Sequence, residues 1–197
     1  MIGGRGLVRI AIGALVLGAV WVLFVGLPAW YGPRPQTAAG TTTAAPASTP
    51  GAAVRRITAT LYYVSEDGMT LAPIQREVPF AASVPEQARA IVDAQLAPAE
   101  PLLSAIPAGT KLREVFVTER GDAFVDLTSE ASTKHTGGTL DEIFTVYTIV
   151  NALTVNLPAI TRVQILLDGR EVDTLAGHVD LRHPLAKSLE WVVHDTH

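Results

Sequence analysis

The chain has 197 residues, of which 48% are hydrophobic, and its formal net charge at neutral pH is −4. It contains no cysteine, which excludes disulfides, a thiol nucleophile and a lipidated N-terminal cysteine. All 19 Asp and Glu residues lie beyond residue 65, and residues 54–197 hold 12 Lys and Arg, a net charge of −7 for this part. An acidic domain argues against binding to nucleic acid or to an anionic membrane surface.

An uncharged apolar run at residues 10–31 predicts a transmembrane helix. Roughly 20 apolar residues at ~1.5 Å rise each span the ~30 Å hydrocarbon core of a bilayer. Trp30 and Tyr31 end the run, where amphipathic rings favour the membrane interface. Two arginines in residues 1–9 orient this N-terminal segment to the cytoplasm. A cleaved signal peptide is the alternative, but Leu27-Pro28-Ala29 is a poor cleavage site.

The chain after the anchor divides into three predicted parts. Residues 32–53 are rich in Pro, Thr and Ala and have no large apolar side chain, which predicts a disordered linker. Residues 54–187 form the candidate globular domain, and residues 188–197 are expected to be a C-terminal tail. We therefore expect a single-pass protein of a bacterial cytoplasmic membrane, with the domain on the extracytoplasmic side.

The first half of the domain predicts two strands and a helix. Residues 57–64 have the composition of a strand, and residues 75–80 are expected to pair with it across a turn at Glu66-Asp67-Gly68. Ser83-Val84-Pro85-Glu86 is a capping box, with Ser83 as N-cap, and opens a helix that stops before Pro98.

A β-hairpin is predicted at the centre of the domain. Residues 112–118 and 122–127 alternate in polarity, and the loop between them ends in Gly121. The expected register aligns Val115 with Val125, Phe116 with Phe124 and, as an unfavourable like-charge pair, Glu114 with Asp126. One face then carries Val115, Val117, Ala123, Val125 and Leu127, and the other carries Leu112, Phe116 and Phe124 among Glu114, Asp122 and Asp126.

The remaining elements complete an α+β pattern. Thr139-Leu140-Asp141-Glu142 reads as a second capping box before a helix, although its β-branched residues would also suit a strand. The apolar face expected for this helix consists of Ile143, Val146, Tyr147, Val150 and Leu153. A strand at 163–167, a turn at Asp168-Gly169 and a return at 171–175 follow. This order predicts a two-layer sandwich, with two helices on one face of a small mixed or antiparallel sheet.

Five motifs in order resemble the GerMN family, the GerM N-terminal type of sporulation and spore germination domain. They are Leu61-Tyr62-Tyr63-Val64, Val125-Asp126-Leu127-Thr128, Val150-Asn151-Ala152-Leu153-Thr154, and the segments 163–169 and 177–181 that resemble its closing strands. The resemblance covers about residues 57–185, with Thr128 in place of the usual Ser. It implies a ring-building-motif-like fold, with two helices on a three-stranded sheet, and roles in sporulation or germination complexes.

No catalytic residue, metal site or cofactor is expected. His178, Asp180 and His183 lack a recognised metal-ligand spacing. Asp122 and Asp126 would lie ~13 Å apart along one strand, beyond the separation of glycosidase carboxylates, so surface charge or turn chemistry explains them better. A hydrolase interpretation of Ser129, Ser132 and His135 lacks a nucleophile elbow.

The hairpin face with two phenylalanines is the candidate partner-binding surface, formed by Leu112, Phe116, Asp122 and Phe124. The first hypothesis is a non-catalytic, membrane-tethered assembly or adaptor module that contacts an envelope protein complex or a second copy of itself. The alternative is a module that binds peptidoglycan or another envelope glycan, since aromatic rings beside acids can stack on and hydrogen-bond sugars.

The topology hypothesis makes a direct prediction. A reporter that works only after export is expected to be active when fused after His197, because the arginines precede the apolar run. A cytoplasm-only reporter at the same position is the control, and its activity would contradict the predicted orientation. A mature N-terminus near residue 30 would show a cleaved signal peptide instead of an anchor.

Overall fold

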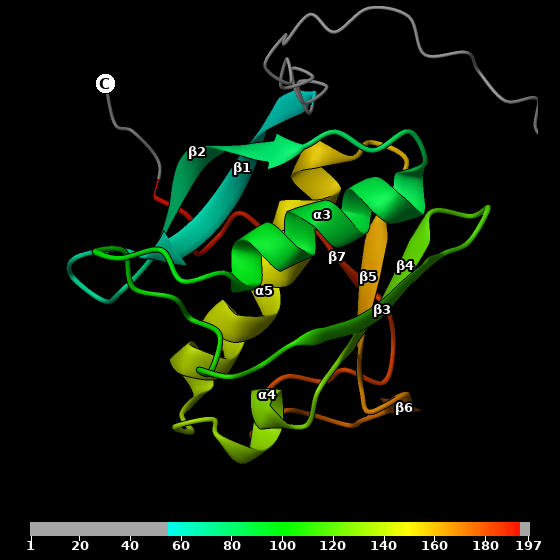
Figure 1. Ribbon diagram of the computed structural model, residues 1–197. Coiled ribbons are helices and arrows are strands. Elements are labelled where there is room, and N and C mark those ends of the chain that lie inside the picture. Colours follow the sequence, from blue (N-terminus) through cyan, green and yellow to red (C-terminus); the bar gives the residue numbers. More distant parts are fainter. Residues whose placement is uncertain (1–54, 194–197) are drawn as a thin grey trace, which may run out of the picture. The chain divides into compact units, whose positions relative to one another are not determined.

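The computed structural model describes residues 55–193 (Figure 1). The predicted N-terminal segment, anchor and linker, and residues 194–197, lie outside the described residues. None of the helices described is long and apolar enough to cross a membrane. The elements are β1 Arg56–Val64, β2 Leu71–Pro79, α3 Val84–Leu96, β3 Leu112–Val117, β4 Asp122–Leu127, α4 Glu130–Thr133, α5 Thr139–Asn156, β5 Arg162–Leu167, β6 Arg170–Glu171 and β7 Leu185–Ala186.

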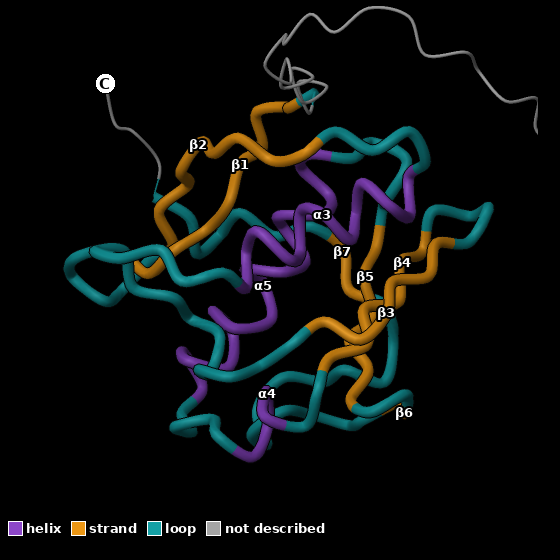
Figure 2. The backbone as a smooth tube through the Cα atoms, in the orientation of Figure 1, coloured by secondary structure: helices purple, strands orange, loops and turns teal. Residues whose placement is uncertain are grey.

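The strands form two separate sheets with α3 and α5 between them. β1 and β2 are an antiparallel pair, and the second sheet has the order β3-β4-β5-β6, with β7 paired to β5. In Figures 1 and 2, α3 and α5 lie between the two sheets, and α5 contacts both β1 and β5. The α+β class is confirmed, but the prediction of one sheet in a two-layer sandwich is wrong, because β1 does not pair with the second sheet.

Side-chain amides take the place of that missing strand pairing. The Asn156 side chain accepts from Thr60 N–H and donates to Thr60 C=O, both at 2.8 Å. Gln95 does the same for Tyr62, at 2.9 and 2.8 Å. A third contact follows at Val64, whose N–H donates to Leu103 C=O at 2.9 Å. The inner edge of β1 is therefore satisfied by α3, α5 and one loop, which removes the cost of burying unpaired backbone groups.

The two predicted capping boxes have different outcomes. Ser83 is the N-cap of α3 and its hydroxyl oxygen accepts from Glu86 N–H, as expected. The second box is wrong: α5 has Gly138 as N-cap without a side-chain cap bond, and Glu142 turns away from the helix end. α5 is buried on most sides, so polar Thr145, Thr148 and Asn151 are as buried as its apolar residues.

The hairpin has the predicted register, with Val115 opposite Val125 and Phe116 opposite Phe124. Its loop glycine, Gly121, has φ +84°, and a Cβ there would lie 2.8 Å from the carbonyl oxygen of Ala159. Glycine is therefore required both for the backbone conformation and for this close approach. β4 pairs in parallel with β5, so the second sheet is mixed.

The C-terminal part departs most from expectation. Residues 177–181 form a loop and not a closing strand, and the predicted return at 171–175 is reduced to β6. The described part of the expected tail, 188–193, packs on the domain: Leu71 N–H donates to Trp191 C=O at 2.7 Å, and Val193 N–H donates to Leu71 C=O at 2.9 Å. The pairing of residues 191–193 with β2 ends there, because Pro73 has no backbone N–H that could continue it.

The amide contacts to β1 predict a large effect of one buried glutamine. Gln95→Ala is expected to destabilise the fold by about 2–4 kcal/mol, because Tyr62 N–H and C=O would be buried without partners. Gln75→Ala, at an exposed position of β2, is the control and is expected to stay within about 0.5 kcal/mol. Urea unfolding followed by circular dichroism measures both. Equal values for the two variants would contradict the proposed role.

Candidate functional site

The outer face of the second sheet carries the predicted aromatic pair. Phe116 is 57% exposed, whereas Phe124 opposite it is half-buried. Gln164 of β5 lies beside Phe124, and its amide donates to the carbonyl groups of Leu181 and Arg182. The C-terminal segment that contains Leu181 and Arg182 therefore covers this face over β5. Phe116 on β3 stays open to solvent.

Leu112 does not belong to this face. A register shift between Leu112 and Glu114 places Leu112 opposite Leu127, and it packs against the hydrophobic core. A β-bulge adds one residue to a strand, so the residues before the bulge point to the opposite face of the sheet from the one that simple alternation predicts. The bulge at Arg113 is the reason why simple alternation misplaced Leu112.

Three acidic residues of the hairpin are each paired with an arginine. Asp122 accepts two hydrogen bonds from Arg162, at 2.7 and 3.0 Å. The like-charge pair expected at Glu114 and Asp126 exists in register, but different arginines compensate it. Arg89 binds Glu114, and this contact holds the pKa of Glu114 below its ordinary value.

Asp126 has a structural role at the end of β4. It is 6% exposed, and its carboxylate accepts from Arg113 at 3.0 Å and from Gly169 N–H at 2.7 Å. The second contact fixes the two-residue turn Asp168-Gly169, in which both residues have positive φ. Turn chemistry is therefore the explanation of Asp126, and the turn that it fixes is Asp168-Gly169.

Glu142 is a fully buried carboxylate that organises a loop, a role that the sequence did not predict. One oxygen accepts from Leu175 and Ala176 N–H at 2.7 and 2.9 Å, and the other accepts from His178 N–H at 2.7 Å. His178 Nδ1 lies 3.1 Å from the same second oxygen. Burial raises the pKa of Glu142, but these hydrogen bonds outweigh burial, so that the pKa lies below its ordinary value. Glu142 thus holds the 175–178 loop onto α5.

Ser132 and His135 are held apart by different partners. The Ser132 hydroxyl donates to Leu175 C=O at 2.7 Å. His135 Nδ1 accepts from Gly137 N–H at 3.0 Å, so its Nε2 carries the proton and faces the Thr145 hydroxyl at 3.2 Å. The segment that holds Ser132 contains the short helix α4. Within residues 55–193, no group of three His, Asp or Glu side chains is arranged to hold a metal ion.

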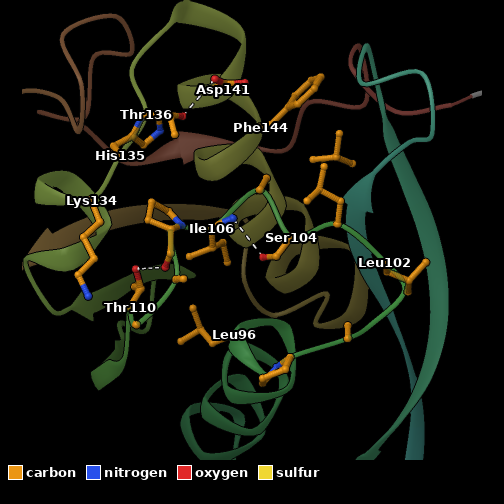
Figure 3. Close-up of a pocket in the computed structure, with 18 of the residues that line it drawn as sticks. Leu96, Leu102, Ser104, Ile106, Thr110, Lys134, His135, Thr136, Asp141 and Phe144 are labelled. Carbon is orange, nitrogen blue, oxygen red and sulfur yellow. Dashed lines mark hydrogen bonds between the residues drawn. The ribbon is translucent and has the colours of Figure 1, made fainter.

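A groove that sequence reasoning did not find lies beside this histidine. Its volume is about 830 Å³, and its walls are the 97–110 loop, the end of α3, the start of α5 and residues 134–136 (Figure 3). The Thr145 hydroxyl donates to Ala105 C=O at 2.6 Å, which ties the loop to α5. No periodic pattern marks such a groove, because most of its wall is irregular backbone.

The described domain is thus a small α+β module with one exposed aromatic face and one groove. Residues 60–173 match the family Germane, described as sporulation and spore germination. The chain belongs to this family, as the resemblance indicated.

Solved structures that are similar to this chain include GerMN domains. The tandem GerMN domains of the sporulation protein GerM from Bacillus subtilis are 17% identical, with a TM-score of 0.52 over 67% of this chain and 46% of that one. The first GerMN domain of the same protein is 18% identical over 68% of this chain and 98% of that one, with a TM-score of 0.48. A Clostridium perfringens protein assigned as a lipoprotein is 24% identical over 67% and 88%, with a TM-score of 0.49. No curated protein matches the chain.

The Glu142 network predicts a pH-dependent contribution to stability. Glu142→Gln is expected to cost about 2–3 kcal/mol at neutral pH, because the amide NH₂ would face backbone donors. The folded-state pKa is lowered, so the stabilisation is present above the ordinary pKa of about 4.3 and is lost as pH falls through the folded value. The difference in unfolding free energy between the two proteins should therefore shrink below about pH 4. A constant difference down to pH 2 would contradict this account.

Proposed function

We propose that the domain is a non-catalytic interaction module, tethered outside the cytoplasm, that acts through protein–protein contacts in a sporulation or germination complex. The observation that carries this proposal is the exposure of Phe116 on a sheet face that the chain's own C-terminal segment leaves open. Aromatic side chains in such positions are enriched among the residues that dominate binding energy. Membership of the sporulation and spore germination family supports the biological context.

The polar chemistry of the domain supports a non-catalytic role. Asp122 and Asp126, the paired carboxylates of the hairpin, are bound to Arg162 and Arg113. Glu142 accepts backbone hydrogen bonds on both oxygens, and these hold a loop. Each of these groups already has a structural partner, and the open aromatic face is a feature of the hairpin that no contact within the described domain explains.

Phe116→Ala tests this proposal. Because Phe116 is exposed, the substitution is expected to change stability by less than about 1 kcal/mol while weakening a complex that the ring anchors by about 2 kcal/mol or more. Val125→Ala is the matched control on the buried face of the same hairpin and is expected to lower the melting temperature clearly. Melting curves and native-gel migration of the complex in solubilised membranes are the measurements.

The possible outcomes separate the hypotheses. Equal loss of melting temperature in the two variants would contradict an exposed role for Phe116, and an intact complex with Phe116→Ala would remove it from the interface. Cosedimentation with purified peptidoglycan that Phe116→Ala abolishes would favour the envelope-glycan alternative. In the glycan hypothesis the Phe116 ring is also the contact, so both assays use the same variants.

A further inference from the structure

The groove beside His135 is built by contacts within the domain. Its outer wall is tied to β1 by the Val64–Leu103 backbone bond and to α5 by the Thr145–Ala105 bond, at 2.9 and 2.6 Å. The Thr110 hydroxyl donates to Pro107 C=O at 2.7 Å and closes the far end of the loop. A wall fixed in this way needs no ligand to form, which lowers the entropic cost of binding.

The groove is lined largely by apolar side chains and continues past one exposed leucine. Leu96, Leu102 and Ile106 line it, and Leu103 at its rim is 65% exposed. On the other side of Leu103 lies a smaller hollow of about 390 Å³ that Glu66 borders. Two hollows joined across an exposed apolar side chain favour an extended chain over a compact small molecule.

The charges differ between the two ends. Figure 3 shows Lys134 on the side of Thr110, with Leu102 on the opposite side. The Lys134 ammonium lies against Gly109, where an added Cβ would be only 2.9 Å away, and Lys134 belongs to none of the ion pairs among residues 55–193. Glu100 and Asp141 are the acidic residues that line the groove, and the Asp141 carboxylate accepts from the Thr136 hydroxyl. Glu130 lies near enough to Lys134 for charge attraction but forms no ion pair with it among the described residues.

We propose that this groove binds an extended apolar peptide segment of a partner protein, with a carboxylate of the peptide at Lys134 and two apolar side chains against Leu102 and Leu103. Complementary charge sets the direction of the peptide, because the Lys134 end attracts an acidic residue and the Glu66 end favours a basic one. This binding surface shares no residue with the Phe116 face, and it is independent of the function proposed above.

Selection from a library of random heptapeptides displayed on phage, with the full chain as bait, tests this inference. The expected sequences hold an acidic residue toward one end and a pair of apolar residues toward the other. Lys134→Glu is expected to replace the selected acidic residue by Lys or Arg, and Leu103→Asp is expected to weaken the best peptide by about tenfold or more. Both positions are exposed, and circular dichroism checks that each variant is folded.

Three results would overturn the inference. The first is a selection that enriches no peptide over selection with the Leu103→Asp variant. The second is that Lys134→Glu still selects peptides with an acidic residue. The third is displacement of the best peptide by micromolar dodecanoate, which would indicate a site for a small amphiphile. Phe116→Ala is the control and is expected to bind the selected peptides normally. A loss of peptide binding in Phe116→Ala would place the contact on the sheet face instead of in the groove.

Discussion

The architecture depends on how the inner edge of β1 is satisfied. A two-stranded sheet has two edges, and the one that faces the protein interior must find partners for its N–H and C=O groups. Here two carboxamides supply them, Gln95 from the end of α3 and Asn156 from the end of α5. Each amide donates and accepts at one residue, as a strand would. Both helices are thereby fixed to β1, and their opposite sides remain available for the second sheet.

This arrangement has a consequence for the surfaces of the domain. With the helices enclosed between two sheets, the outer face of the second sheet must be covered by the chain itself or meet solvent. The C-terminal segment covers it at Gln164 and stops short of Phe116. The groove arises at the other side, where the 97–110 loop leaves α3 and bonds to β1 at Val64. Both candidate interaction surfaces therefore follow from the packing of the helices.

The sequence predicted the local elements far better than their arrangement. The hairpin register was predictable because Gly121 and the alternation of Val115 and Val125 fix it, and α3 because Ser83 caps it. The bulge at Arg113 has no sequence signal, so Leu112 was placed on the wrong face. Glu142 follows a threonine at capping-box spacing, yet its partners lie more than 30 residues away, and tertiary bonding overrode the local pattern.

The separate β1–β2 sheet rests on amide side chains, which no periodicity reveals. The groove is formed by irregular backbone and was equally invisible.

Amide hydrogen exchange at Thr60 and Tyr62 tests the central claim most directly. These two N–H groups are bonded only to side-chain oxygens of Asn156 and Gln95. If the carboxamides join β1 to the helices, both amides should exchange as slowly as the backbone-paired amides of β1, through global unfolding. In Gln95→Ala the Tyr62 amide should lose this protection, while Thr60 keeps most of its own. Fast exchange at both positions in the unmodified protein would show that β1 is held by other contacts and would contradict the account.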